Sequence, residues 1–79
     1  MVKNKKEKTM YSENIAPRLR KARRECEMTQ NEVAKKLNLN QSTIAGYEKG
    51  RTEPNAEMLA TLAQLYCHSV DYFLGLADD

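Results

Sequence analysis

The sequence predicts a small all-α domain built from five short helices. Apolar residues recur at steps of three and four along most of the chain, the spacing that places them on one face of a helix. Most of these segments are bounded by residue types that favour helix ends. The 79 residues, 41% of them apolar and 30% charged, suit one compact domain with a single core.

The central stretch, TQNEVAKKLNLNQSTIAGYEKG, organises the rest of the chain. Thr29 and Glu32 have the spacing of a capping box, in which a hydroxyl and a carboxylate each bond an unpaired backbone N–H. The apolar period breaks at Asn38, a residue that tolerates the positive φ of a sharp helix exit. Asn40 is then placed to cap a second helix. The stretch predicts two short helices joined by a tight turn.

The second of these helices, which should end at Gly50, is predicted to carry a contact surface. Ile44 and Tyr47 lie three residues apart and are expected to face inward. A helix face that only meets solvent is usually rich in Glu and Lys, whereas this one carries an amide, two hydroxyls and two positions with almost no side chain. Gly46 costs about 0.5–1 kcal/mol relative to Ala inside a helix, so we expect something to approach the backbone there. The expected outward set is Gln41, Ser42, Thr43, Ala45, Gly46 and Lys49.

The helix that precedes this pair is expected to begin near Asn14. Pro17 would then fall in the first turn, where its missing N–H has no partner to lose. An inward stripe follows at steps of four, three and four residues and comprises Ile15, Leu19, Ala22 and Cys26. The basic side chains expected on the outer face are Arg18, Arg20, Lys21 and Arg24.

Two further helices are predicted after a loop closed by Pro54. Asn55 is placed to cap the fourth helix and Ser69 to cap a short fifth one. The expected buried positions are Leu59, Leu62, Ala63 and Tyr66 in the fourth helix and Val70, Phe73 and Leu74 in the fifth. Cys26 and Cys67 form no CxxC pair, and we interpret them as reduced thiols at helix ends.

Charge is unevenly distributed, although the net charge is only +2. Lysine and arginine dominate before Met28, whereas every charged residue from Thr52 onward is acidic. One end of the domain should therefore meet polyanions and the other avoid them. Residues 1–12 are expected to form a flexible basic arm, which either contacts a groove beside the main site or is a plain leader. Residues 13–76 should form the domain and 77–79 an acidic tail.

An ordered set of motifs runs from Ile15 to Gly75, most of the chain. It begins with Ile15, Leu19 and Arg23 and continues with TQNEVAKKL, QSTIAGYEKGRTEPN and LATLAQLYCHSVDYFLG. These pieces, in this order and spacing, resemble the Cro/cI (XRE-type) repressor family. The resemblance implies a lambda-repressor-like DNA-binding domain with a helix-turn-helix.

The resemblance also implies a sequence-specific transcriptional regulator, expected to be a repressor, with helix 40–49 in the major groove of double-stranded DNA. Gln41 suits adenine, because its carbonyl and amide can bond N6 and N7 at once. The side chains expected to meet bases are Gln41, Ser42, Thr43, Ala45 and Gly46. Those expected to bind phosphate are Gln30, Lys49, Arg51 and Asn55, and Gln30 should also brace Gln41.

One structural pair carries over from the family. Arg23 matches an arginine that pairs with a glutamate, here Glu48, and so locks the first helix to the recognition helix. A partly buried pair of this kind fixes geometry more reliably than it adds stability. The sequence departs from the family pattern at Gly46, which offers no side chain to read, and at Cys67 and His68, where a glycine and an aliphatic residue are usual.

Other classes of function are disfavoured. The only histidine is His68, and no nucleophile motif or phosphate loop accompanies it, so we expect no enzyme. Cys26, Cys67 and His68 give three ligands where structural zinc takes four, so we expect no metal and no cofactor. No apolar run reaches the roughly 20 residues of a membrane span, which favours a cytoplasmic protein. The alternative is a protein-interaction module of the same fold, an antitoxin or a transcription adaptor.

A homodimer is expected, because one recognition helix reads too few base pairs to find an operator among the sites of a genome. Two copies on a palindromic operator would read half-sites about 34 Å apart. The C-terminal end should supply the dimer surface through Tyr72, Leu76 and Leu74, which leave more apolar area than a short last helix needs. The acidic character of this end would keep it away from DNA.

Overall fold

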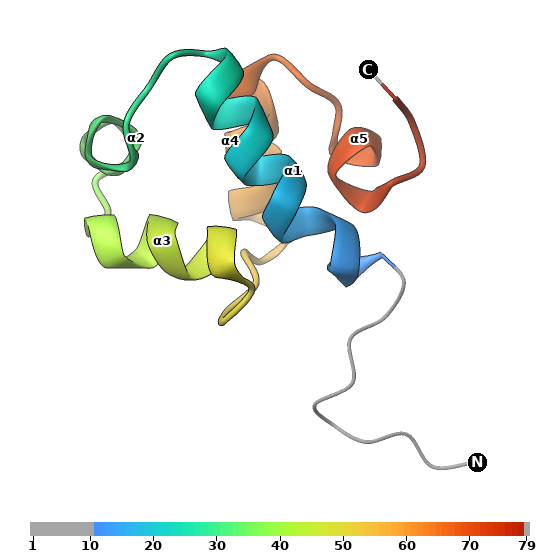
Figure 1. Ribbon diagram of the computed structural model, residues 1–79, viewed down its shortest axis with the longest axis horizontal. Helices are drawn as coiled ribbons and strands as arrows, with labels where there is room; N and C mark the ends of the chain where they lie inside the picture. The colour runs from blue at the N-terminus through green and yellow to red at the C-terminus, as the bar shows by residue number, and fades with distance from the viewer. Residues whose placement is uncertain (1–10, 79) are drawn as a thin grey trace, which may run out of the picture.

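The computed structural model describes residues 11–78, which contain five helices and no strand (Figure 1). This confirms the predicted all-α fold class. The helices are α1 Ser12–Glu25, α2 Gln30–Leu37, α3 Gln41–Lys49, α4 Ala56–Tyr66 and α5 Val70–Leu74.

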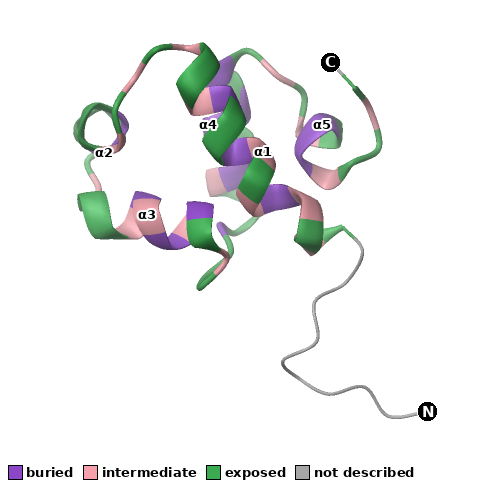
Figure 2. Cartoon of the chain, viewed as in Figure 1, coloured by how far each residue is buried: buried purple, intermediate pink, exposed green. Residues whose placement is uncertain are grey.

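Helix α1 runs through the middle of the molecule (Figure 1). It packs against α3, α4 and α5, while α2 packs against α3. Apolar side chains from all five helices meet in one core, with Phe73, Leu19 and Ile44 among its most deeply buried members (Figure 2). The inward stripes predicted for α1, α4 and α5 are confirmed, with Cys26, Val70 and Leu74 packed at the edge of the core.

The turn between α2 and α3 follows the sequence closely, with one exception. Both bonds of the capping box are present: Glu32 N–H donates to Thr29 Oγ1 at 3.0 Å, and Thr29 N–H donates to Glu32 Oε1 at 2.8 Å. Asn38 leaves α2 with φ 58°, in the left-handed region. Asn40 occupies the N-cap of α3, but its side chain makes no cap hydrogen bond. The prediction of a side-chain cap there was wrong, because Thr43 N–H bonds the backbone carbonyl of Asn40 instead, at 3.0 Å.

The start of α1 also differs from the prediction. The helix begins at Ser12 rather than near Asn14, so Pro17 lies inside it and beyond the first turn. The position before the helix, Tyr11, is itself helical and makes no side-chain cap, so no cap signal marked this boundary in the sequence. Helix α1 therefore takes in the last residue of the predicted arm. Of the other arm residues, Tyr11 directly precedes the helix and 1–10 lie outside the described residues.

Arg18 of α1 holds the C-terminal segment of the chain against that helix. Its Nη1 donates to the carbonyl oxygens of Tyr72 at 2.8 Å and Ala77 at 3.1 Å, and its guanidinium carbon lies 4.8 Å from the centroid of the Tyr72 ring. The ring of His68 also stacks on the Tyr72 ring, with 4.0 Å between the two centroids. Arg18 is thus partly buried rather than on the outer face, and Tyr72 is buried rather than exposed. Both predictions are corrected.

Two glycines have different reasons for lacking a side chain. Gly75 ends α5 with φ 81°, and a Cβ there would overlap the side chain of Asn14, whose Nδ2 donates to Leu74 O at 3.3 Å. Gly46 lies inside α3, where a Cβ would meet Thr52 Oγ1 at 3.4 Å, an ordinary van der Waals distance. Of these two glycines, only Gly75 is required by the fold.

This difference predicts opposite effects of alanine at the two positions. Gly75→Ala should lower the free energy of unfolding by about 1–3 kcal/mol, because it combines a strained φ with a collision. Gly46→Ala should raise it by about 0.5–1 kcal/mol, because alanine favours the helix. Urea unfolding followed by circular dichroism measures both. A Gly75→Ala variant as stable as the parent would contradict the packing against Asn14.

Candidate nucleic-acid interface

The outer face of α3 is polar and exposed at its start and end. Gln41, Ser42 and Lys49 are exposed, and Thr43 and Ala45 are half-buried. Ile44 and Glu48 lie on the buried side with Gly46 (Figure 2). Gly46 was predicted to face outward, but it is buried and lies beside Thr52 of the following loop, at the floor of the hollow that Ser42 and Thr43 also line.

A buried ion pair joins α1 to α3. Arg23 Nε donates to Glu48 Oε2 at 2.7 Å, and Arg23 Nη2 donates to Glu48 Oε1 at 3.0 Å, which makes a two-bond fork. The two side chains are 11% and 3% exposed. Arg23 Nη1 also donates to Met28 O at 2.7 Å, which ties the turn after α1 to the same guanidinium. The pairing of Arg23 with Glu48 that the family resemblance implies is present.

Gln30 extends this arrangement to the start of α3. Its Nε2 donates to Glu48 Oε1 at 3.1 Å, and its Oε1 accepts from Gln41 Nε2 at 3.2 Å. The predicted bracing of Gln41 by Gln30 is therefore observed. Because Glu48 also accepts from Arg23, four side chains form one network: Arg23, Glu48, Gln30 and Gln41.

The environment keeps Arg23 charged. The hydrogen bond that Arg23 donates to the Glu48 carboxylate raises the pKa of Arg23 above its ordinary value. Burial, together with the nearby Glu48 carboxylate, raises the pKa of Tyr66 well above its usual range, so its hydroxyl stays neutral. Among the described residues no buried side-chain nitrogen or oxygen lacks a hydrogen-bond partner. A fully satisfied network of this kind rigidifies the groups that it holds.

The side chains predicted to bind phosphate lie at both ends of α3. Gln30 lies beside the N-terminus of α3, where it accepts a hydrogen bond from Gln41. Lys49 is exposed at the C-terminus of α3. Arg51 is exposed in the following loop and lines a hollow that also includes Ser42 and Thr43. Asn55 caps α4 by accepting from Met58 N–H at 2.8 Å, as predicted, and this cap uses only its Oδ1.

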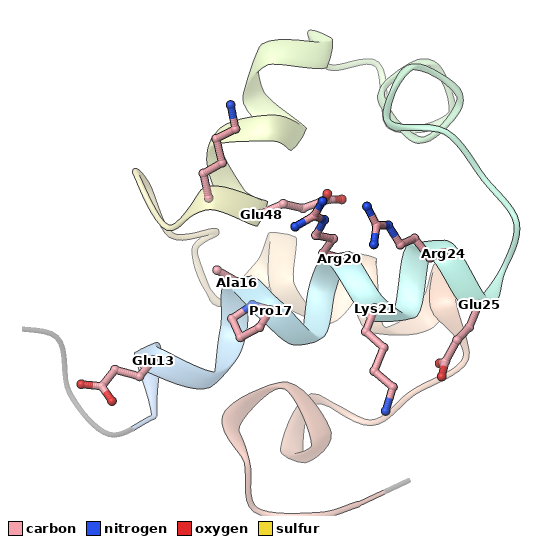
Figure 3. A pocket seen from close by; sticks show the side chains of 9 residues that line it. Glu13, Ala16, Pro17, Arg20, Lys21, Arg24, Glu25 and Glu48 are labelled. Carbon is pink, nitrogen blue, oxygen red and sulfur yellow. The ribbon is translucent and has the colours of Figure 1, made fainter.

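A basic groove lies between α1 and α3, and it was not predicted from the sequence. The side chains of Arg20 and Arg24 point from α1 toward Glu48, whereas Lys21 and Glu25 point away (Figure 3). Arg20 and Arg24 line a smaller hollow together with Arg23, Gln30, Glu48 and Lys49. The available signal was their spacing of four residues on the helix face that also carries Arg23.

Comparison with known proteins identifies the family. A family model described as helix-turn-helix matches residues 19–72. The chain belongs to the Cro/cI (XRE-type) helix-turn-helix family. This family consists of DNA-binding transcription regulators and is typically not enzymatic.

Relatives of this family cover most of the chain. The chain is 42% identical over 62 residues to the uncharacterized HTH-type transcriptional regulator YobD of Bacillus subtilis, covering 78% of the chain and 55% of that protein. It is 37% identical over 62 residues to the HTH-type transcriptional regulator ImmR of the same organism, covering 78% and 49%. It is 41% identical over 54 residues to antitoxin HigA1 of Mycobacterium tuberculosis, covering 68% and 34%. The chain spans about half the length of the first two relatives.

None of the helices within residues 11–78 is long and apolar enough to cross a membrane. Within the same residues, no three or more His, Cys, Asp and Glu side chains gather closely enough to hold a metal ion.

The burial of the Arg23–Glu48 pair predicts strong coupling between the two residues. Glu48→Ala or Arg23→Ala should each cost about 3 kcal/mol of unfolding free energy, because either one leaves a poorly exposed charge without its partner. The double variant should lose less than the sum, with a coupling of about 1–3 kcal/mol. Urea unfolding of the parent and the three variants provides the cycle. Losses that simply add would show that the pair does not form in solution.

Proposed function

We propose that the protein is a sequence-specific regulator of transcription that inserts α3 into the major groove of double-stranded DNA and acts as a repressor. The observation that carries the proposal is the network that ends on Gln41: a surface amide is held in place by Gln30, which is itself held by a buried ion pair. Such preorganisation serves a side chain that must meet a partner in one geometry. Its DNA target would place the protein at the nucleoid, in the cytoplasm.

The chemistry of Gln41 suits adenine. Its amide nitrogen has two hydrogens, of which Gln30 takes one, so the other can be donated to N7 while Oε1 accepts from N6. Ser42 follows at the exposed start of α3 and can bond several bases, and the methyl group of Ala45 can contact a thymine methyl. Thr43 is half-buried and would read from the edge of the contact. Gly46 is buried and carries no side chain, so we assign it no hydrogen bond to a base.

The proposed phosphate contacts surround this face. Gln30 lies in the first turn of α2, where backbone N–H groups and the helix dipole favour an anion. Lys49, Arg51 and the amide nitrogen of Asn55 would hold the backbone near the other end of α3. Arg20 and Arg24 extend the basic surface from Lys49 along α1 and add charge for a neighbouring phosphate.

We further propose that the protein acts as a homodimer on a palindromic operator, through its C-terminal end. Among the described residues, Leu76 and Tyr11 are the large apolar side chains left exposed, at 59% and 47%. Both line one hollow together with Leu74, Gly75 and the polar residues Glu13 and Asn14, and we call the apolar part of this lining the apolar patch. Tyr72, which the sequence predicts at this surface, is instead buried in the core. A palindrome can itself bring two weakly associating copies together.

A second candidate is a protein-interaction module, and it is favoured by the relative named antitoxin HigA1. Electrophoretic mobility shift with random genomic duplexes separates the two. A DNA-binding regulator should shift the duplexes at low salt and release them at high salt, because non-specific binding is largely electrostatic. An absence of any shift at low salt would favour the interaction module.

The base-reading role predicts a change in preference when Gln41 is truncated. Gln41→Ala should lose discrimination at one position of each half-site, at a cost of about 1–3 kcal/mol there. Selection of bound duplexes from a random pool, carried out on the parent and the variant, measures the preference at every position. Gln30→Ala is the informative companion, because it should weaken the same preference without removing the reading side chain. Unchanged discrimination in Gln41→Ala would rule out this residue as a reader.

The phosphate contacts predict a loss that does not depend on sequence. Arg51→Ala and Arg24→Ala should each weaken binding to all duplexes alike and lower the slope of log K against log salt by about one. Lys21→Ala is the matched control, since it removes a positive charge from the same helix but its side chain points away from α3 and Glu48 (Figure 3). An equal effect in Lys21→Ala would show that net charge, and not the groove, is responsible.

The dimer proposal predicts two chains on each palindromic duplex. Leu76→Asp should reduce the cooperativity of binding, because it places a charge in the apolar patch. Light scattering of the complex gives the stoichiometry, and titration of full and half operators gives the cooperativity. Glu57→Asp, an exposed change on α4 outside the patch, should leave both unchanged. One chain per full operator would overturn the dimer.

A further inference from the structure

The two cysteines of the chain lie together although they are far apart in sequence. Cys26 is the C-cap residue of α1 and Cys67 is the C-cap residue of α4. Cys26 Sγ lies 3.8 Å from the carbonyl oxygen of Tyr66, the residue bonded to Cys67. The carbonyl oxygen of Tyr66 is three covalent bonds away from the Cα atom of Cys67. The Sγ atom of Cys26 therefore lies within about 7 Å of the Cys67 Cα atom. Rotation of the Cys67 side chain and small shifts at the two helix ends can bring the sulfurs to bonding distance.

The two thiols differ in their surroundings. Cys26 is half-buried against the core, and this burial raises its pKa, with further contributions from the nearby Cys67 and Glu25. Cys67 is exposed and therefore open to reagents from solvent. It also adopts φ 61°, a left-handed conformation in which glycine would be the favoured residue. The chain thus carries an accessible thiol at a position where the backbone alone would prefer no side chain.

We propose that Cys26 and Cys67 are a redox-sensitive pair that peroxide converts into an intramolecular disulfide between the ends of α1 and α4. The exposed Cys67, as thiolate, attacks hydrogen peroxide, forms a sulfenic acid and releases hydroxide. The Cys26 thiol then attacks the sulfenic sulfur, which forms the S–S bond and releases water. In sum, two thiols and one peroxide give one disulfide and two waters, and a dithiol reductant reverses the change.

The position of the bond determines its effect. The loop that it closes contains α2, α3 and the whole of α4, so it restrains the unfolded chain around the helix-turn-helix. It also fixes the turn before Gln30, where Met28 O is already held by Arg23. Neither cysteine belongs to α3, so the outward face of that helix stays open in the oxidised protein.

The test uses the full chain and hydrogen peroxide, with intact mass spectrometry and a non-reducing gel. We expect a monomeric product lighter than the reduced protein by two hydrogen atoms, formed at a rate independent of protein concentration. Its midpoint of thermal unfolding should rise by about 10 °C and return to the starting value with dithiothreitol. Cys26→Ser and Cys67→Ser should each lack the lighter product.

A lighter monomer present in the parent and absent from both serine variants supports the pair. Disulfide-linked dimers, or only species heavier by added oxygen, would overturn it, because both show that the two sulfurs of one chain do not meet. Far-ultraviolet circular dichroism of the serine variants checks that they fold, and the mass of the parent decides the question even if one does not. The experiment contains no DNA, so its failure would leave the proposed regulator function untouched.

Discussion

The structure depends on one buried carboxylate. The side chain of Glu48 is only 3% exposed. A carboxylate at such a site needs an opposite charge and hydrogen bonds to offset the hydration that it loses on burial. Arg23 supplies the pair with a two-bond fork, and this fork fixes how α3 lies against α1. Since Glu48 also accepts from Gln30, the same carboxylate sets the position of α2. Three helices are thus oriented around one group.

This constraint matters because α2 and α3 are short. Helices of 8 and 9 residues are too short to be stable alone in water, so their order comes from packing and from the network. The network ends on Gln41 at the surface, which places a polar side chain with little freedom at the start of α3. Recognition of base edges requires a rigid helix face with an amide side chain that is already oriented, and a basic surface around it. The fold and the proposed function therefore share one physical cause.

Patterns confined to neighbouring residues predicted the structure well. The capping box of Thr29 and Glu32, the left-handed exit at Asn38 and the inward stripes were all readable, because each depends on residues within one or two turns. The predictions failed where a local signal was missing or ambiguous. Pro17 suggested a later start for α1 than the structure has, and Asn40 has the right type for a side-chain cap but does not make one.

The sequence by itself determined the number and ends of most helices, their buried faces and the family. It could not decide which polar side chains the tertiary structure draws inward. Arg18 was predicted on the outer face, but in the structure it binds carbonyl oxygens of α5 and of the C-terminal segment and contacts the ring of Tyr72. In the same way, Cys26 and Cys67 become neighbours only because α1 and α4 end at one place. Such contacts join residues far apart in the chain, and a local periodicity carries no information about which distant partner will cover a given side chain.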